Sequence, residues 1–134
     1  MNDDVIINKA NIIERCLKRI NEEYDNNPEN LKNYTKQDSI ILNLQRACEA
    51  SIDLAMHLIA KKKLGVPQTS REAFDVLHQQ DLIPEELAKK MKAMVGFRNI
   101  AVHDYQKVNL DILKSILENH LIDFQQYTKV IMQT

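Results

Sequence analysis

The chain has 134 residues, of which 44% are hydrophobic and 28% are charged, and its formal net charge is −1 at pH 7. This length and composition predict a single globular domain, over residues 1–134, that is long enough to bury a core. The nearly balanced charge excludes a general electrostatic attraction to nucleic acid, so any RNA binding must depend on a local basic surface.

Residues that form turns are scarce, with two glycines and three prolines in the whole chain. This scarcity favours a few long helices over many short strands. No apolar run approaches the roughly 18–20 residues that cross a bilayer, and the acidic N-terminus does not resemble a secretory signal. Cys16 and Cys48 lie far apart without C-x-x-C spacing. We therefore interpret them as reduced thiols in or near the core of a cytoplasmic protein.

The first half of the chain predicts two helices. Apolar residues at helical spacing predict a helix over residues 4–24, and the N-N-P-E-N segment that follows stops it. Thr35 and Asp38 form a T-x-x-D variant of the capping box, so the second helix is expected to start there with Asp38 as a cap. This helix is expected to reach about Leu64, and Gly65 fits the C′ position after it.

The second half of the chain predicts three further helices. Thr69 and Glu72 form a capping box in front of a short helix of about residues 70–80. Pro84 fits the first position of a fourth helix, and Asn109 can cap a last helix that fills the C-terminal segment. Short connections between these amphipathic segments predict an all-α, antiparallel bundle of about five helices.

A cluster of polar residues follows the apolar part of the fourth helix, at Arg98, Asn99, His103, Asp104 and Tyr105. Asn99 and His103 are four residues apart and share a helix face. Arg98 and His103 are separated by roughly 140° around the helix, but a long arginine at a fraying helix end can still approach the imidazole. The helix C-terminus favours a protonated imidazole. A titratable imidazole beside a fixed guanidinium suits the cleavage of a phosphodiester.

The same residues allow a purely structural interpretation. Arg98 can pair with a carboxylate, His103 can close the helix end, and Tyr105 can be an ordinary amphipathic tyrosine that is half-buried there. An R-x-x-x-x-H string is short and also occurs by chance. Spacing alone therefore leaves the catalytic and the structural interpretations open.

The segment "RNIAVHDY" resembles the R-N-x-x-x-H core of the HEPN ribonuclease superfamily, and more closely the R-x-x-x-x-H-x-Y form of the HepT toxins. The similarity extends over nearly the whole chain, through "TKQDSIILNLQRACEASIDLAMHLIAKKKLGVPQTSREAF" and "MVGFRNIAVHDY". The resemblance implies an all-α, HEPN-like fold. Every position of the motif is present.

HepT-like proteins are dimeric, metal-independent endoribonucleases in which the motif residues of both protomers line a shared cleft. They are toxins of toxin–antitoxin pairs, and the partner is an MNT-type nucleotidyltransferase that attaches AMP to the motif tyrosine. For this chain the resemblance implies Arg98 and His103 as the catalytic pair, Asn99 as their polar companion and Tyr105 as the modified residue. The expected partners are RNA, a second copy of the chain and the antitoxin, in a homodimer or a hetero-oligomer.

The expected mechanism needs no metal or other cofactor. His103 would assist the attack of an RNA 2′-hydroxyl on the adjacent phosphate, while Arg98 stabilises charge on the phosphoryl oxygens. A two-fold axis through the cleft would supply a second His103, so that one imidazole can be protonated and one neutral. The four histidines show no H-E-x-x-H or H-x-x-x-H spacing typical of a metal site.

Other charged residues receive weaker predictions. Lys107 lies closest to the motif and is the preferred contact to RNA, whereas the run Lys61–Lys63 is typical of a solvated helix face. His57 follows Asp53 by four residues, so the two can interact along one helix face. His57 can also line the cleft, but a pair on the surface or between helices is favoured. The alternative to a nuclease is a non-catalytic helical dimer that acts as the binding partner of a nucleotidyltransferase.

Overall fold

The computed structural model describes residues 3–134, and this range contains helices and no strands. The all-α bundle predicted from the sequence is confirmed, with six α-helices and two short 3₁₀ helices in the described range. The elements in chain order are α1 (Asp4–Tyr24), η1 (Pro28–Lys32), α2 (Tyr34–Lys61), α3 (Ser70–Gln79), α4 (Glu85–His103), η2 (Tyr105–Lys107), α5 (Leu110–Asn119) and α6 (Leu121–Met132).

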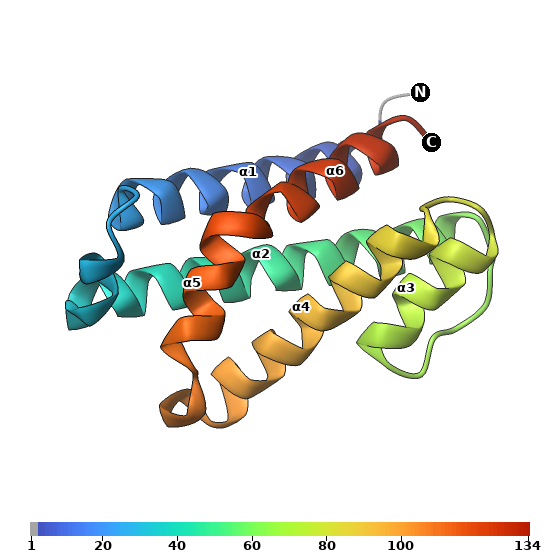
Figure 1. Cartoon of the computed structure of the whole chain (residues 1–134). Helices are drawn as coiled ribbons and strands as arrows, with labels where there is room; N and C mark the ends of the chain where they lie inside the picture. The colour runs from blue at the N-terminus through green and yellow to red at the C-terminus, as the bar shows by residue number, and fades with distance from the viewer. Residues whose placement is uncertain (1–2) are drawn as a thin grey trace.

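Helices α1 and α2 form a long antiparallel pair (Figure 1). At one end of this pair Asp3 caps α1, accepting hydrogen bonds from the backbone N–H groups of Val5 and Ile6. The same carboxylate is 2.8 Å from both His57 Nε2 and Lys61 Nζ of α2. These hydrogen bonds, first that of Lys61 and then that of His57, hold the pKa of the Asp3 carboxyl well below its usual range.

His57 and Asp53 do not contact each other, and His57 instead makes a pair between helices. The Asp53 carboxylate is 3.0 Å from Lys9 Nζ of α1, because residue 53 faces α1, while His57 reaches the start of α1 at Asp3. Asp53 and His57 of α2 therefore both contact α1.

The start of α2 also differs from the prediction. Asn33, not Thr35, is the N-cap, and its side chain accepts a hydrogen bond of 3.0 Å from the backbone N–H of Lys36. Asn33 has the extended backbone of a cap residue, and asparagine caps a helix as well as threonine does. Asp38 is therefore not a cap. It lies in the second turn of α2, where its carboxylate is available for other contacts.

The end of α2 is a Schellman motif centred on Lys63. Lys63 has the left-handed backbone (φ 55°) that was expected of Gly65. The Leu64 N–H bonds to the carbonyl of Ile59 at 3.0 Å, and the Lys63 N–H bonds to that of Ala60 at 3.2 Å. Gly65 also has positive φ, at 116°, in the connection that follows.

The boundaries of α3 and α4 are close to the prediction. Thr69 Oγ1 accepts a hydrogen bond of 3.1 Å from the Glu72 N–H, which confirms the cap, and the Glu72 carboxylate accepts one from Gln68. Pro84 is the N-cap of α4 and not its first residue, because the helix begins at Glu85.

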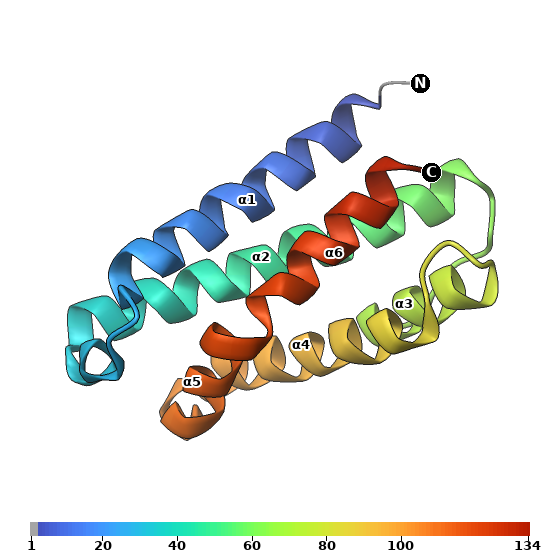
Figure 2. The same cartoon turned by 45° about the horizontal axis from the view of Figure 1, so that its top comes forward.

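The expected last helix is divided into two at His120. Asn109 caps α5 as expected, accepting hydrogen bonds from the N–H groups of Asp111 and Ile112. At the break, His120 Nδ1 is 2.9 Å from Oδ2 of the buried Asp123, and Lys90 of α4 is 3.8 Å from the same carboxylate. The break lets α5 turn away from the axis of α6, which packs against α1 and α4 (Figure 2).

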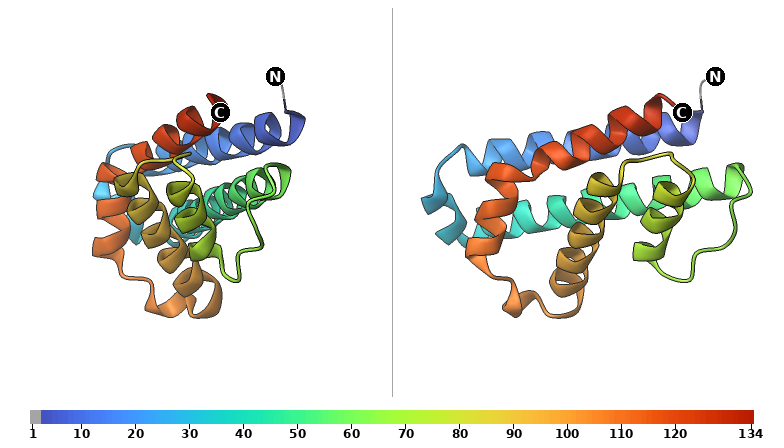
Figure 3. Two further views of the ribbon diagram at one scale, coloured as in Figure 1. Left: turned by 90° about the vertical axis from the view of Figure 1, so that its right-hand side faces the viewer. Right: turned by 45° about the vertical axis from the view of Figure 1, so that its right-hand side comes forward.

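The core of the described residues includes side chains from all six α-helices, and its aromatic pair joins α3 to α6. Phe74 and Tyr127 are fully buried with their rings edge to face at 5.6 Å, and the Tyr127 hydroxyl donates a hydrogen bond of 2.8 Å to the Ser51 carbonyl. Cys16 and Cys48 are free and buried, as predicted. The start of α1 and the end of α6 lie at the same end of the bundle (Figure 3). Within residues 3–134, no helix is both long and apolar enough to span a membrane.

Candidate functional site

The polar motif occupies the last two turns of α4 and the 3₁₀ helix η2. Helix α4 ends at His103, close to the predicted end, and the Asp104 N–H still bonds to the Ile100 carbonyl at 2.8 Å. The Lys107 N–H then bonds to the Asp104 carbonyl at 2.9 Å, which closes η2. The motif residues therefore lie on regular backbone, which limits the directions that their side chains can take.

Arg98 is half-buried and points from α4 toward α3. Its Nη2 is 3.4 Å from the Ser70 hydroxyl, and its Nε is buried without a hydrogen-bond acceptor among residues 3–134. No carboxylate of the described chain lies within ion-pair distance of Arg98, so the expected pairing of the structural interpretation is wrong. The half-buried guanidinium has no carboxylate partner in the described chain, so its positive charge is available to attract an anionic oxygen.

His103 is exposed in the last turn of α4, and Asn99 is half-buried one turn before it. Within the described range, His103 makes no hydrogen bond or ion pair to another side chain, and neither contact joins it to Arg98. Within one copy of the chain, the Arg98 guanidinium and the His103 imidazole therefore lie at the same end of α4 without a hydrogen bond between them.

Tyr105 is 40% exposed, and its hydroxyl donates a hydrogen bond to Oδ1 of Asp38 on α2. Partial burial, and then the hydrogen bond and the negative charge of Asp38, raise the pKa of the Tyr105 phenol above its ordinary value. The two residues line a groove of about 360 Å³ together with Tyr34, Gln37, Ile41 and Gln106.

The role of Asp38 was missed from the sequence. Asp38 and Tyr105 are separated by 67 positions, and the contact depends on how η2 returns to α2, which no local pattern encodes. The capping pattern at Thr35 also gave Asp38 a plausible but different role.

Lys107 is 3.4 Å from the Asp104 carboxylate, and their side chains are 79% and 47% exposed. An ion pair this exposed contributes little and exchanges readily with other partners. By contrast, the ammonium of Lys92 is 2.8 Å from Asp75, and Lys61 is held by Asp3. Lys107 is thus the lysine next to the motif whose charge is most accessible.

An apolar groove of about 470 Å³ borders the motif between α4 and α5. Ile100 lies on α4 between Arg98 and His103 and is 47% exposed, and Ile112 of α5 is 55% exposed. The other apolar residues that line the groove are Met94, Phe97, Val108 and Ile116. Exposed apolar side chains grouped around a groove are typical of a surface that binds another protein.

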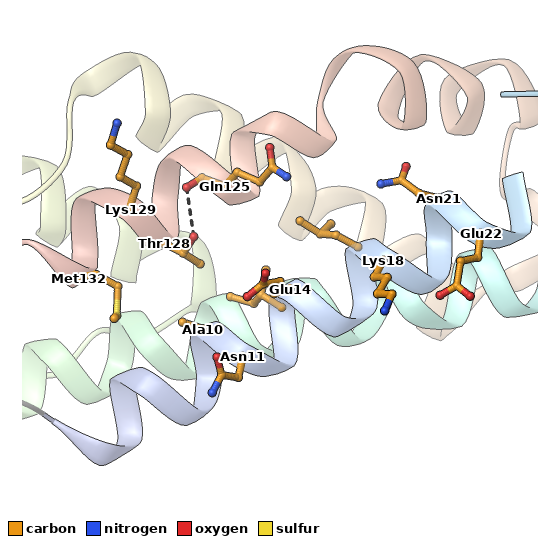
Figure 4. Close-up of a pocket in the computed structure, with 12 residues that line it drawn as sticks. Ala10, Asn11, Glu14, Lys18, Asn21, Glu22, Gln125, Thr128, Lys129 and Met132 are labelled. Atoms are coloured by element: carbon orange, nitrogen blue, oxygen red, sulfur yellow. Dashed lines mark hydrogen bonds between the residues drawn. The ribbon is translucent and has the colours of Figure 1, made fainter. Parts of the chain in front are cut away.

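A larger groove, of about 800 Å³, lies between α1 and α6 and contains none of the motif residues (Figure 4). Its lining mixes Glu14 and Lys18 of α1 with Lys129 of α6. The hydrogen bond drawn in the figure joins the Thr128 hydroxyl to the Gln125 carbonyl within α6. This groove holds no pair of groups suited to phosphodiester chemistry, so the candidate site is the end of α4 with η2.

Comparison with known proteins identifies similar sequences over nearly the whole chain. A model of the ribonuclease HepT-like family matches residues 13–131. The mRNA nuclease HepT of Shewanella oneidensis is 50% identical over 129 residues, which cover 96% of this chain and 97% of that protein. A tRNA nuclease HepT of Aphanizomenon flos-aquae is 36% identical over 66 residues, 49% of this chain and 45% of that protein.

Solved structures give the same result in three dimensions. The tri-AMPylated HEPN toxin of Shewanella oneidensis, solved in complex with its MNT antitoxin, matches with a TM-score of 0.93 and 50% sequence identity over 100% of both chains. A toxin–antitoxin complex solved with AMP-PNP contains a chain that matches with a TM-score of 0.92 and 50% identity, over 98% of this chain and 99% of that one.

Proposed function

This chain belongs to the ribonuclease HepT-like family, and we propose that it is the endoribonuclease toxin of a toxin–antitoxin pair. The observation that carries the proposal is the complete R-x-x-x-x-H-x-Y motif at the end of α4. It presents an exposed imidazole, a half-buried guanidinium and an accessible phenol in a chain whose relatives include an mRNA nuclease at 50% identity.

The proposed reaction is cleavage of RNA by its own 2′-hydroxyl. His103 takes the proton of that hydroxyl, the oxygen attacks the adjacent phosphorus, and the bond from phosphorus to the 5′-oxygen breaks. The leaving oxygen takes up a proton, so the products are a 2′,3′-cyclic phosphate and a 5′-hydroxyl. Arg98 stabilises the charge on the phosphoryl oxygens. Asn99, on the same helix face as His103, helps to orient the substrate, and Lys107 contacts the RNA backbone.

The active form is proposed to be a homodimer. One chain leaves Arg98 and His103 apart, and each chain has one motif histidine, whereas the reaction uses both a base and an acid. The exposed apolar groove with Ile100 and Ile112 borders the motif and suits association with a second copy. A two-fold axis there would place both motifs in one cleft.

An MNT-type nucleotidyltransferase is proposed as the antitoxin, either in transient contact or in a hetero-oligomer. It would attach AMP to the Tyr105 hydroxyl. The AMP would add a negative phosphodiester and a nucleoside beside Lys107, where both oppose the entry of an RNA backbone. The relative that was solved with its MNT antitoxin carries AMP, which supports this assignment.

The test is incubation of purified, unmodified protein with RNA in excess EDTA, followed by analysis of the product ends. We expect cleavage in the chelator, with 2′,3′-cyclic phosphate and 5′-hydroxyl ends. His103→Ala should lower the rate by at least about 10²-fold, because it removes the proton-transfer group. His78→Ala, which changes a half-buried histidine of α3, is the control.

Two results would contradict parts of the proposal. Full activity of His103→Ala would remove the role of this imidazole, and loss of cleavage in EDTA would contradict metal independence. An unmodified chain that leaves all RNA intact but still accepts AMP would favour the alternative, a non-catalytic partner of the nucleotidyltransferase.

A further inference from the structure

We propose that Asp38 is the base that accepts the Tyr105 proton when an adenylyl group is transferred to this tyrosine. The inference rests on the proposed function, because it concerns the same modification. On this proposal, a side chain of the toxin itself makes its tyrosine a better acceptor of the adenylyl group.

The first observation is the direction of the contact. The Tyr105 hydroxyl donates to Oδ1 of Asp38, so the proton that must leave already points at a carboxylate. Asp38 lies in α2 and Tyr105 in η2, and both are on regular backbone that fixes their separation. A base within hydrogen-bond distance of the proton satisfies the first requirement of general base catalysis.

The second observation is that the Asp38 carboxylate makes no ion pair with another described side chain. Among residues 3–134, no lysine, arginine or histidine lies within ion-pair distance of it. The titratable groups that line the surrounding groove are Tyr34, Asp38 and Tyr105, and the ion pair of Lys107 with Asp104 lies outside that lining. No side-chain cation of the described residues therefore competes with the Tyr105 proton for these oxygens.

The third observation is the accessibility of the phenol. The chain contains a second tyrosine–carboxylate bond, from the Tyr24 hydroxyl to Glu118, but Tyr24 is only 3% exposed. Tyr105 is 40% exposed and borders an open groove. A nucleoside triphosphate can therefore reach the hydroxyl of Tyr105 but not that of Tyr24.

In the proposed transfer, one bond to the α-phosphorus forms as another breaks. The Tyr105 oxygen attacks the α-phosphorus of ATP as its proton passes to Asp38, and the bond from that phosphorus to pyrophosphate breaks. The same carboxylate disfavours a free phenolate, so loss of the proton and attack by the oxygen should occur together. After transfer, Asp38 faces a negatively charged phosphodiester in place of a hydrogen-bond donor.

The experiment measures AMP incorporation into Tyr105 by intact mass, with ATP, Mg²⁺ and an MNT-type nucleotidyltransferase. Asp38→Asn keeps an oxygen that can accept the hydrogen bond but cannot take the proton. It should lower kcat for adenylylation by about 10²-fold and leave the KM for the toxin unchanged. Asp38→Ala removes both functions and should also raise that KM.

A pH profile separates a base from a structural contact. The wild-type rate should change little from about pH 6.5 to 8.5, because the phenol proton passes directly to Asp38 and no free phenolate is needed. The rate of Asp38→Asn should rise about tenfold per pH unit, because the reaction must then use the small phenolate fraction of Tyr105. A contact that only holds the side chain in place would lower the rate equally at every pH.

The matched control is Glu118→Gln, the same change in the other tyrosine–carboxylate bond, and it should leave the adenylylation rate unaltered. Thermal unfolding of each variant checks that it is folded. A wild-type rate or a flat pH profile for Asp38→Asn, with the wild-type chain modified, would overturn this inference alone. Absence of AMP on wild-type Tyr105 would overturn both the role of Asp38 and the proposed inactivation of the toxin by AMP. RNA cleavage by the unmodified wild-type chain, scored in the same preparation, reports on the nuclease separately.

Discussion

Arg98 and His103 have different surroundings although only five residues of α4 separate them. The Arg98 guanidinium is half-buried, and one of its N–H groups is bound to Ser70. Its orientation is therefore largely set by the fold, so in the proposed reaction little entropy would be lost when a phosphate binds. His103 is exposed and makes no hydrogen bond to the described side chains, so its ring can reorient, as the proposed proton transfer would require.

Arg98→Lys tests the planar geometry of the guanidinium apart from its charge. Lysine keeps the positive charge but cannot hold two phosphoryl oxygens in a fork. We expect RNA cleavage to fall by about 10²–10³-fold in kcat, measured in single-turnover assays. Arg71→Lys on the neighbouring α3 is the matched control, since Arg71 contacts the Lys92 carbonyl and not the motif. An unchanged rate for Arg98→Lys would show that only the charge matters.

At the scale of the helices, contacts of charged and polar side chains lie at the points where helices begin and where one helix contacts another. Asp3 is the clearest case, because one carboxylate caps α1 and binds His57 and Lys61 of α2. His120 and Asp123 act in the same way at the break between α5 and α6. Such residues fix both a helix boundary and the angle at which the next helix leaves.

Asp3→Asn tests the charge of this contact while keeping a good N-cap. The pKa of Asp3 is lowered in the folded chain, so its contribution to stability is present above the unfolded pKa of about 3.9 and is lost as pH falls below that value. Wild type should therefore unfold at higher urea than Asp3→Asn at pH 7, and the difference should shrink below about pH 4 and in high salt. Asp25→Asn, an exposed aspartate without an ion pair, is the control. A difference that does not depend on pH would contradict the charge model.

Sequence patterns predicted the helices well where one strong signal was present. The Thr69 capping box and the Asn109 cap are confirmed. At α2, Asn33 and Thr35 are both good cap residues, and only the path of the preceding turn selects Asn33. The break at His120 has no proline or glycine to announce it, and it is accompanied by a contact between His120 and the buried Asp123.

Sequence patterns predicted where the candidate site lies in the fold but only part of its contacts. Local spacing and family resemblance placed the motif at the end of α4. The contacts of Arg98 with Ser70 and of Tyr105 with Asp38 join distant segments, and they follow only from the packed fold. Periodicity within one helix contains no information on such contacts.

At the scale of the whole molecule, one apolar surface has no partner within a single chain. Ile100 and Ile112 face the groove between α4 and α5, next to the motif. Exposing them to water is unfavourable, and burying them against a second copy would remove that cost. Association would then also bring two motifs together, so that stability and activity depend on the same surface.

Ile112→Glu tests this dependence. A glutamate in the groove would have to be buried without a partner on association, so the variant should be monomeric by light scattering. Its rate of RNA cleavage should fall at least about tenfold. Its helix content, measured by circular dichroism, should equal that of the wild type. Val66→Glu, at an exposed apolar residue outside the groove, is the control. A monomer with full cleavage would show that one chain carries a complete site.

The two buried thiols have a practical consequence for following this protein in solution. Burial raises the pKa of Cys16 and Cys48 and keeps reagents away from them. A cysteine introduced on the surface would therefore react first with a maleimide dye. Gln106 is exposed in η2 beside Tyr105, so a fluorophore on Gln106→Cys would report the arrival of a nucleotide, an RNA or a docking protein in real time, with both native cysteines left in place.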